Sequence, residues 1–232
     1  MQAVLITGAS RGLGLALVQK FHAHKYKVYA VVRSISAYQR ITEMYPDVSV
    51  LVADITDVDY EKSLENFLCN TTVDIIINNA GSAGTTGTNT INSTSEQLTY
   101  EFRTHCIGAL STVKAVLESM KPLSPSLVIN ISSRRGSLSM QAAGATKAVV
   151  CSFSYRIAKA AQNMLSLCMA DDLENMGVKV VSIHPGAMLT KMAPADATLS
   201  PEQSASRLLK MIESGKLSSR EFICLETGML QW

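Results

Sequence analysis

Charged residues are scarce in this chain of 232 residues, and neither sign of charge dominates. Asp, Glu, Lys and Arg make up 17% of the sequence, and the net charge is +2, whereas about 25% is usual in soluble proteins. Without a basic excess, a protein that binds the backbone of a nucleic acid is not expected. Apolar residues reach 47%, which excludes a disordered chain, because disorder requires low hydrophobicity and high net charge.

Long apolar runs and metal-binding patterns are also missing. No run approaches the roughly 18 residues of a membrane helix, and the chain begins without the charged and apolar segments of a signal peptide. We therefore expect a cytoplasmic protein with no membrane partner. The five cysteines include no Cys-x-x-Cys pair, and His22 and His24 are only two positions apart. Reduced thiols and no metal site are expected.

Short apolar segments rich in Val and Ile alternate with amphipathic segments along the chain. Such runs are typical of parallel strands buried on both faces. Strands are expected at Ala3–Thr7, Val28–Val32, Val48–Ala53, Val73–Asn78, Leu127–Ile131, Val178–His184 and Phe222–Leu225. Helices are expected at Gly12–Ala23, Ser36–Tyr45, Asp57–Asn70, Ser95–Met120, Tyr155–Met176 and Pro201–Ser214. The alternation predicts an α/β fold: one doubly wound Rossmann-type domain over residues 1–232, with a parallel seven-stranded sheet and helices on both faces.

A glycine-rich segment, GASRGLG, joins the first expected strand to the first expected helix. Its glycines allow a tight turn and let backbone N–H groups at the helix N-terminus approach a pyrophosphate. A turn that merely uses glycine is the alternative, but the position between strand and helix favours a nucleotide site. The residues expected to bind are Gly8, Ser10, Arg11, Gly12, Leu13 and Gly14.

The end of the second expected strand indicates which dinucleotide is preferred. An acidic residue there usually binds the 2′-hydroxyl of the adenosine ribose, but this strand is followed by Arg33. Arg33, together with Arg11, is suited to pair with a 2′-phosphate. A solvated surface charge is the alternative for each arginine. The sequence favours NADP(H) over NAD(H).

Tyr155 and Lys159 are four positions apart at the start of an expected helix, so they share one face. A free phenol titrates near pH 10. A neighbouring ammonium lowers the pKa of the phenol, which lets the pair exchange a proton nearer neutral pH. Ser132 and Ser133 follow an expected strand, where a hydroxyl can bind a substrate oxygen. The alternatives are a chance helical spacing and a polar turn.

In their order along the chain, these residues resemble the motifs of the short-chain dehydrogenase/reductase family. The motifs are Thr7 to Gly14, Asp54, Asn78 to Gly81, Ile131 to Ser133, Tyr155 with Lys159, and Pro185-Gly186 with Thr190. The ending, Glu226 to Trp232, and the long separation between Ser133 and Tyr155 look most like sniffer-type carbonyl reductases and C-factor-like proteins. The resemblance covers nearly the whole chain.

The resemblance implies a role for each matching residue. Ser133 would orient a carbonyl, Tyr155 would exchange its proton, and Lys159 would lower the tyrosine pKa and hold the nicotinamide ribose. Further contacts to the dinucleotide are implied for Asp54, Ile55, Asn79, Ala80, Gly81, Pro185, Gly186, Met188 and Thr190. His105 stands where the family has an Asn that binds a proton-relay water. A place in the relay and a packing role both remain open for His105.

We therefore expect an NADP(H)-dependent oxidoreductase that moves a hydride between nicotinamide and a small carbonyl/alcohol substrate, with Tyr155 as general acid/base. The substrate pocket is expected to include Ser82, Ala83, Arg134, Met140, Met188 and Met192. The resemblance also implies a homodimer or homotetramer, with the helices Ser95–Met120 and Tyr155–Met176 at the interface. The alternative is a dinucleotide-binding regulatory or signalling protein of C-factor type with little turnover.

Overall fold

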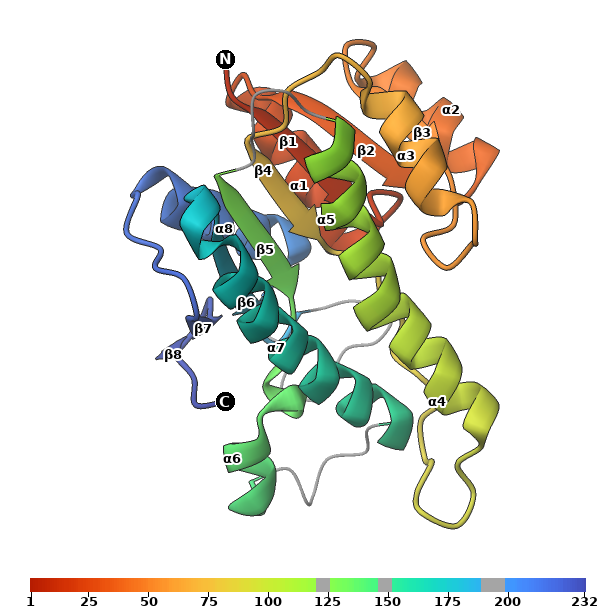
Figure 1. Cartoon of the computed structure of the whole chain (residues 1–232), viewed down its shortest axis with the longest axis vertical. Helices are drawn as coiled ribbons and strands as arrows, with labels where there is room; N and C mark the ends of the chain where they lie inside the picture. Colours follow the sequence, from red (N-terminus) through yellow and green to blue (C-terminus); the bar gives the residue numbers. More distant parts are fainter. Residues whose placement is uncertain (120–125, 146–151, 189–198) are drawn as a thin grey trace.

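The computed structural model describes residues 1–119, 126–145, 152–188 and 199–232, and these form an α/β Rossmann-type domain around one sheet (Figure 1). The strand order is β3-β2-β1-β4-β5-β6-β7-β8, and the first seven strands along the chain run parallel. Their bounds are β1 Ala3–Thr7, β2 Lys27–Val32, β3 Ser49–Val52, β4 Ile75–Asn78, β5 Leu127–Ile131, β6 Lys179–His184 and β7 Phe222–Cys224. The predicted fold class is confirmed.

The sheet has eight strands rather than the seven expected. The additional strand, β8 (Gly228–Met229), pairs antiparallel with β7 after a tight reversal of the chain. Gly228 adopts a φ of 84°, a left-handed conformation that glycine accepts without steric cost. A strand of two residues is too short to show an alternating pattern, so it could not be predicted from the pattern of apolar residues.

Helices cover both faces of the sheet. Their bounds are α1 Gly12–Ala23, α2 Ile35–Met44, α3 Tyr60–Leu68, α4 Ser95–Phe102, α5 Gly108–Ser119, α6 Leu138–Ala142, α7 Phe153–Leu173 and α8 Pro201–Glu213. The side chains of β1 alternate between two apolar clusters: Val4 and Ile6 pack in one, and Leu5 packs in the other. Because successive strand residues point to opposite faces, each parallel strand needs apolar residues throughout.

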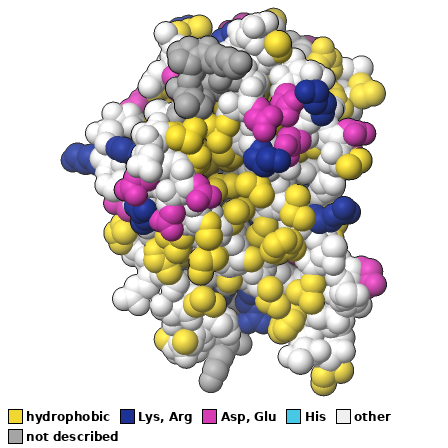
Figure 2. Space-filling view, in the orientation of Figure 1, with side chains coloured by type: hydrophobic (Ala, Val, Ile, Leu, Met, Phe, Trp, Pro, Cys, Tyr) yellow, Lys and Arg dark blue, Asp and Glu magenta, His cyan; other side chains and the backbone are white. Residues whose placement is uncertain are grey.

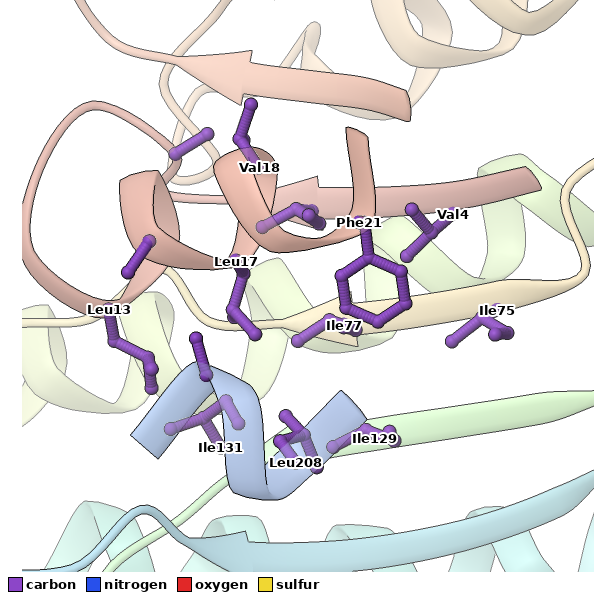
Figure 3. Close-up of a cluster of buried hydrophobic side chains, with 14 of the residues drawn as sticks. Val4, Leu13, Leu17, Val18, Phe21, Ile75, Ile77, Ile129, Ile131 and Leu208 are labelled. Atoms are coloured by element: carbon purple, nitrogen blue, oxygen red, sulfur yellow. The ribbon is translucent and has the colours of Figure 1, made fainter. Parts of the chain in front are cut away.

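The first cluster lies between the sheet and the helices α1, α2 and α8. Phe21 and Leu17 of α1, Leu208 of α8 and the strand residues Ile77 and Ile129 all belong to this cluster (Figure 3). Phe21 is completely buried, and burial of a side chain of this size contributes roughly 1.5–3 kcal/mol. The second cluster lies under α3, α5 and α7. These two layers hold the carboxyl ends of the strands in place.

The long helix expected at Ser95–Met120 contains a π-helical turn, Arg103–Ile107, between α4 and α5. Thr94 and Gln97 form a capping box at its start, which satisfies two backbone N–H groups. Met120 lies outside the described residues. The π-helical turn has His105 at its centre, and such turns are frequent at functional sites. Within the described ranges, no helix is both long and apolar enough to cross a membrane.

Candidate functional site

The carboxyl ends of the parallel strands surround a cavity of about 600 Å³, which we call the principal cavity. In open α/β sheets, ligands bind at this edge. Most of the residues expected to bind a dinucleotide or to act in catalysis line it. These are Gly8, Ser10, Arg11, Gly12, Leu13, Gly14, Arg33, Asp54, Ile55, Asn79, Ala80, Gly81, His105, Tyr155, Lys159, Pro185 and Met188.

Some expected residues do not line the principal cavity. Ser133 and Gly186 are absent from its lining, as are Arg134 and Met140 from the expected substrate pocket. Thr190 and Met192 lie outside the described residues. Of the remaining expected substrate residues, Ser82, Ala83 and Met188 do line the cavity.

The two serines after β5 use their hydroxyl groups differently. Ser132 donates a hydrogen bond to Asn163 Oδ1 at 2.5 Å, whereas Ser133 Oγ accepts one from the backbone N–H of Arg135. Ser132 lines the principal cavity, and Ser133 caps the short turn Arg134–Gly136 next to it. The hydroxyl proton of Ser132 is thus already used in a hydrogen bond within the protein. The hydroxyl oxygen of Ser133 accepts a hydrogen bond from the turn.

The glycine loop fits a pyrophosphate. A Cβ on Gly14 would lie 2.2 Å from Gly8 O, and one on Gly8 would lie 2.6 Å from Ala80 Cα. These two glycines therefore permit close packing of the loop. Gly12 has a φ of 54° and no atom within 4 Å of its Cβ position, so open space adjoins the first turn of α1. Arg11 provides no side-chain cap there, which leaves that helix N-terminus suited to an anion.

Two further arginine side chains, those of Arg33 and Arg40, lie near the glycine loop. Arg33 is 67% exposed, and its Nη1 lies 3.7 Å from Asp54 Oδ2. Arg40, from α2, donates a hydrogen bond to the carbonyl oxygen of Ser10 in the glycine loop. Arg40 was not predicted, because only the packing of α2 against the loop brings it to Ser10.

Lys159 is fully buried beside Tyr155. Its Nζ donates to Ile131 O at 2.7 Å and to Gln162 Oε1 at 2.8 Å, and it lies 5.7 Å from the centroid of the Tyr155 ring. Burial lowers the pKa of Lys159 to about 7, although nearby Cys106 and Glu101 oppose the shift. Gln162 was not predicted. It follows Lys159 by three positions, the spacing of neighbours on one helix face.

His105 fills the space between the loop after β4 and Tyr155. A Cβ on Gly81 would lie 2.7 Å from His105 Cε1, and the ring of Tyr155 packs edge-on at a centroid distance of 5.5 Å. Burial and the positive charge of Lys159 lower the pKa of His105 to about 4. The imidazole is therefore neutral at neutral pH.

Glu101 is a buried partner of His105 that was not predicted from the sequence. Its Oε2 lies 3.2 Å from His105 Nε2, and its Oε1 accepts a hydrogen bond from Ser82 Oγ at 2.5 Å. Burial raises the pKa of Glu101, but the close approach of His105 and the hydrogen bond from Ser82 outweigh burial and keep that pKa below its usual value. The spacing of four residues on a helix was a signal that could have found the pair.

Comparison with known proteins identifies the family. A model described as short chain dehydrogenase matches residues 2–199. C-signal from Myxococcus xanthus is 31% identical over 147 residues, which cover 63% of this chain and 84% of that protein. An NADPH-bound carbonyl reductase from chicken fatty liver has a TM-score of 0.85 and 27% identity, covering 100% of this chain and 99% of that one. The carbonyl reductase Sniffer of Drosophila melanogaster has the same TM-score at 24% identity over the full length of both chains, a likeness of fold. The resemblance predicted from the motifs is confirmed: the chain belongs to the short-chain dehydrogenase family and is an oxidoreductase of small molecules.

Proposed function

We propose that this protein is an NADP(H)-dependent reductase of small carbonyl compounds, or a dehydrogenase of the matching alcohols, with Tyr155 as general acid/base. The observation that carries the proposal is the position of Tyr155 beside the buried Lys159, in the same cavity as the open first turn of α1. The NADPH-bound carbonyl reductase from chicken fatty liver supports the choice of cofactor and substrate class.

The residues of the principal cavity divide the binding of the dinucleotide between them. The glycine loop and the N-terminus of α1 would bind the pyrophosphate. Arg11 and Arg33 would bind the 2′-phosphate, because a guanidinium forms strong hydrogen bonds to phosphate oxygens. Lys159 would hold the nicotinamide ribose, and Pro185 and Met188 would border the nicotinamide. When bound, NADPH supplies the hydride.

Tyr155 and Ser133 would act on the carbonyl oxygen. Tyr155 donates its hydroxyl proton as negative charge develops on that oxygen, and the ammonium of Lys159 stabilises the resulting phenolate. Ser132 lines the principal cavity and Ser133 caps the turn beside it, yet the hydroxyl of Ser133 is the better suited to orient the carbonyl. Ser132 already donates its proton to Asn163, whereas Ser133 accepts a hydrogen bond and keeps its own proton for a substrate oxygen.

The test is the absorbance of NADPH in the presence of a panel of aldehydes, ketones and diones. Oxidation of NADPH that depends on the carbonyl compound is the expected result.

A second candidate function, a regulatory protein of C-factor type, is favoured by the similarity to C-signal. Tight binding of NADPH without turnover of any compound would contradict the enzyme and support that alternative.

We also propose a homodimer or homotetramer formed through α5 and α7. Exposed apolar side chains occur on the π-helical turn and α5, at Ile107 and Leu110, and on α7, at Ile157 and Met164. Figure 2 shows hydrophobic side chains gathered on the face where α5 and α7 lie in Figure 1. Such patches mark protein interfaces. Analytical ultracentrifugation of the wild type and of an Ile107→Glu/Met164→Glu variant should show loss of the oligomer in the variant. A wild type that sediments as a monomer would contradict this.

A further inference from the structure

A second cavity, of about 370 Å³, adjoins the principal cavity. Ser82 and Tyr100 line both cavities, Glu101 lines the second, and His105 lines the principal one. The side chains of Glu101 and His105 approach to 3.2 Å. The Glu101–His105 pair therefore lies in the wall between the two cavities and connects them.

This pair is an unusual component of a protein interior. Among the described residues, Glu101 is the only acidic residue that is buried, with 2% of its surface exposed. A buried carboxylate is costly unless hydrogen bonds satisfy it, and an apolar residue in its place often gives a more stable protein. Ser82 satisfies Oε1, while Oε2 faces His105. The mechanism proposed above does not use Glu101.

Resting on the proposed function, we propose that Ser82, Glu101 and His105 form a proton path between the second cavity and Tyr155. Glu101 lies at the entrance, with Ser82 fixing its carboxylate. His105 is the intermediate, in ring contact with Tyr155. Both imidazole nitrogens are buried in the resting structure, and the two rings pack edge-to-face. The last transfer therefore requires a rotation of the His105 ring that brings Nδ1 to the phenol or to one bridging water molecule in the principal cavity.

Reduction of one carbonyl group adds a hydride, with its two electrons, to carbon and moves the Tyr155 proton to oxygen. Tyr155 is left as a phenolate and must regain one proton before the next turnover. A proton from the second cavity protonates Glu101 and passes from Oε2 to Nε2 of His105. The imidazole releases the proton of Nδ1 toward Tyr155. Exchange of the tautomer restores His105, so the net change is one proton taken from solvent.

The charges around His105 suit this exchange. Glu101 on α4 and Lys159 on α7 are the charged groups that act on it, Tyr155 and Cys106 are titratable neighbours, and the loop after β4 presents only Gly81 and Ser82. Burial and Lys159 lower the pKa of His105 to about 4, so the ring is neutral. A neutral imidazole carries one donor and one acceptor nitrogen, as a relay requires.

The decisive variant is Glu101→Gln, which keeps the shape of the side chain and an acceptor for Ser82 but cannot carry a proton. The matched control is Glu96→Gln, because Glu96 also lines the second cavity and is exposed. For Glu101→Gln we expect kcat to fall at least about tenfold, with KM and NADPH affinity unchanged and a larger solvent isotope effect on kcat. Glu101→Asp should recover part of the loss. Glu96→Gln should match the wild type.

A readout without cofactor is the NMR pH titration of the His105 imidazole, whose resonances should change in Glu101→Gln and not in Glu96→Gln. If Glu101→Gln fails to fold, Ser82→Ala should lower kcat in the same direction. A wild type that oxidises NADPH while Glu101→Gln keeps its kcat and isotope effect would overturn the proton path alone. Lack of turnover by the wild type with every carbonyl compound would overturn the proposed function and the path together.

Discussion

The two ends of the principal cavity are built in opposite ways. At the dinucleotide end, the glycine loop, Arg33 and Asp54 all come from the N-terminal part of the chain, and the side chain of Arg33 is 67% exposed. At the catalytic end, Glu101, His105 and Lys159 come from α4, the π-helical turn and α7, and each is buried. Water and salt screen the exposed charges, whereas buried charges interact strongly. Substitutions at the exposed end should change affinity, and those at the buried end should change chemistry.

The largest expected effect is on the rate of Tyr155→Phe, a substitution that should lower turnover without changing the affinity for NADPH. Tyr155→Phe removes the exchangeable proton but keeps the ring that packs against His105. Turnover of the best substrate should fall by at least about 10²-fold, the usual cost of a lost general acid, while NADPH affinity stays within error. Steady-state kinetics and fluorescence titration measure the two quantities. Tyr38→Phe, which changes a partly exposed tyrosine on α2, is the control. Equal losses of NADPH affinity and of turnover in Tyr155→Phe would mean that the buried end does not act on the chemistry alone.

The same contrast explains what the sequence could predict. The glycine loop was predictable because its strand, turn and helix are neighbours in the chain, and α1 begins and ends where its pattern indicated. Tyr155 and Lys159 were found from helical spacing. Arg40, Gln162 and Glu101 were missed, since their partners depend on how α2, α7 and α4 pack.

The next effect tests the exposed end. Arg33→Asp replaces an attraction to the 2′-phosphate with a repulsion, and the nearby Asp54 adds to it. A charge-assisted hydrogen bond contributes roughly 1.5–3 kcal/mol, and about 1.4 kcal/mol is a tenfold change in affinity. NADPH affinity should fall about 10- to 100-fold, with kcat at saturating cofactor nearly unchanged. Lys216→Asp makes the same charge change outside the principal cavity and should have no effect. A wild type that binds NADH more tightly than NADPH would contradict the role of Arg33.

A buried imidazole at the end of β6, that of His184, makes the stability of the fold depend on pH. Burial, followed by the charge of Arg134, lowers the pKa of His184 to about 4 from 6.5. Because its folded-state pKa is depressed, the neutral ring contributes stability that is present above pH 6.5 and is lost as the pH falls toward 4. The free energy of unfolding should drop by about 2 kcal/mol from this group between pH 7 and pH 5.

Urea denaturation at several pH values measures this loss. His184→Gln cannot titrate and should show a shallower decline on the acid side. His24→Gln, at a side chain that is 48% exposed, is the matched control and should keep the slope of the wild type. Identical slopes for all three proteins would mean that the buried ring does not resist protonation.

The smallest expected effect concerns His105, where the buried end departs from the family pattern. His105→Asn restores the residue that the family has and keeps a polar group able to bind water, so kcat at neutral pH should change by less than about tenfold. The acid limb of its pH profile of kcat should be flatter, because the imidazole that becomes protonated as the pH approaches about 4 is gone.

His105→Leu fills the same space without a polar atom. It should lower kcat while thermal unfolding shows an intact fold, because Gly81 and Tyr155 still enclose an apolar side chain. Superimposable pH profiles of kcat for all three proteins would make His105 a packing residue. The catalytic end would then differ from the dinucleotide end in burial and not in proton transfer.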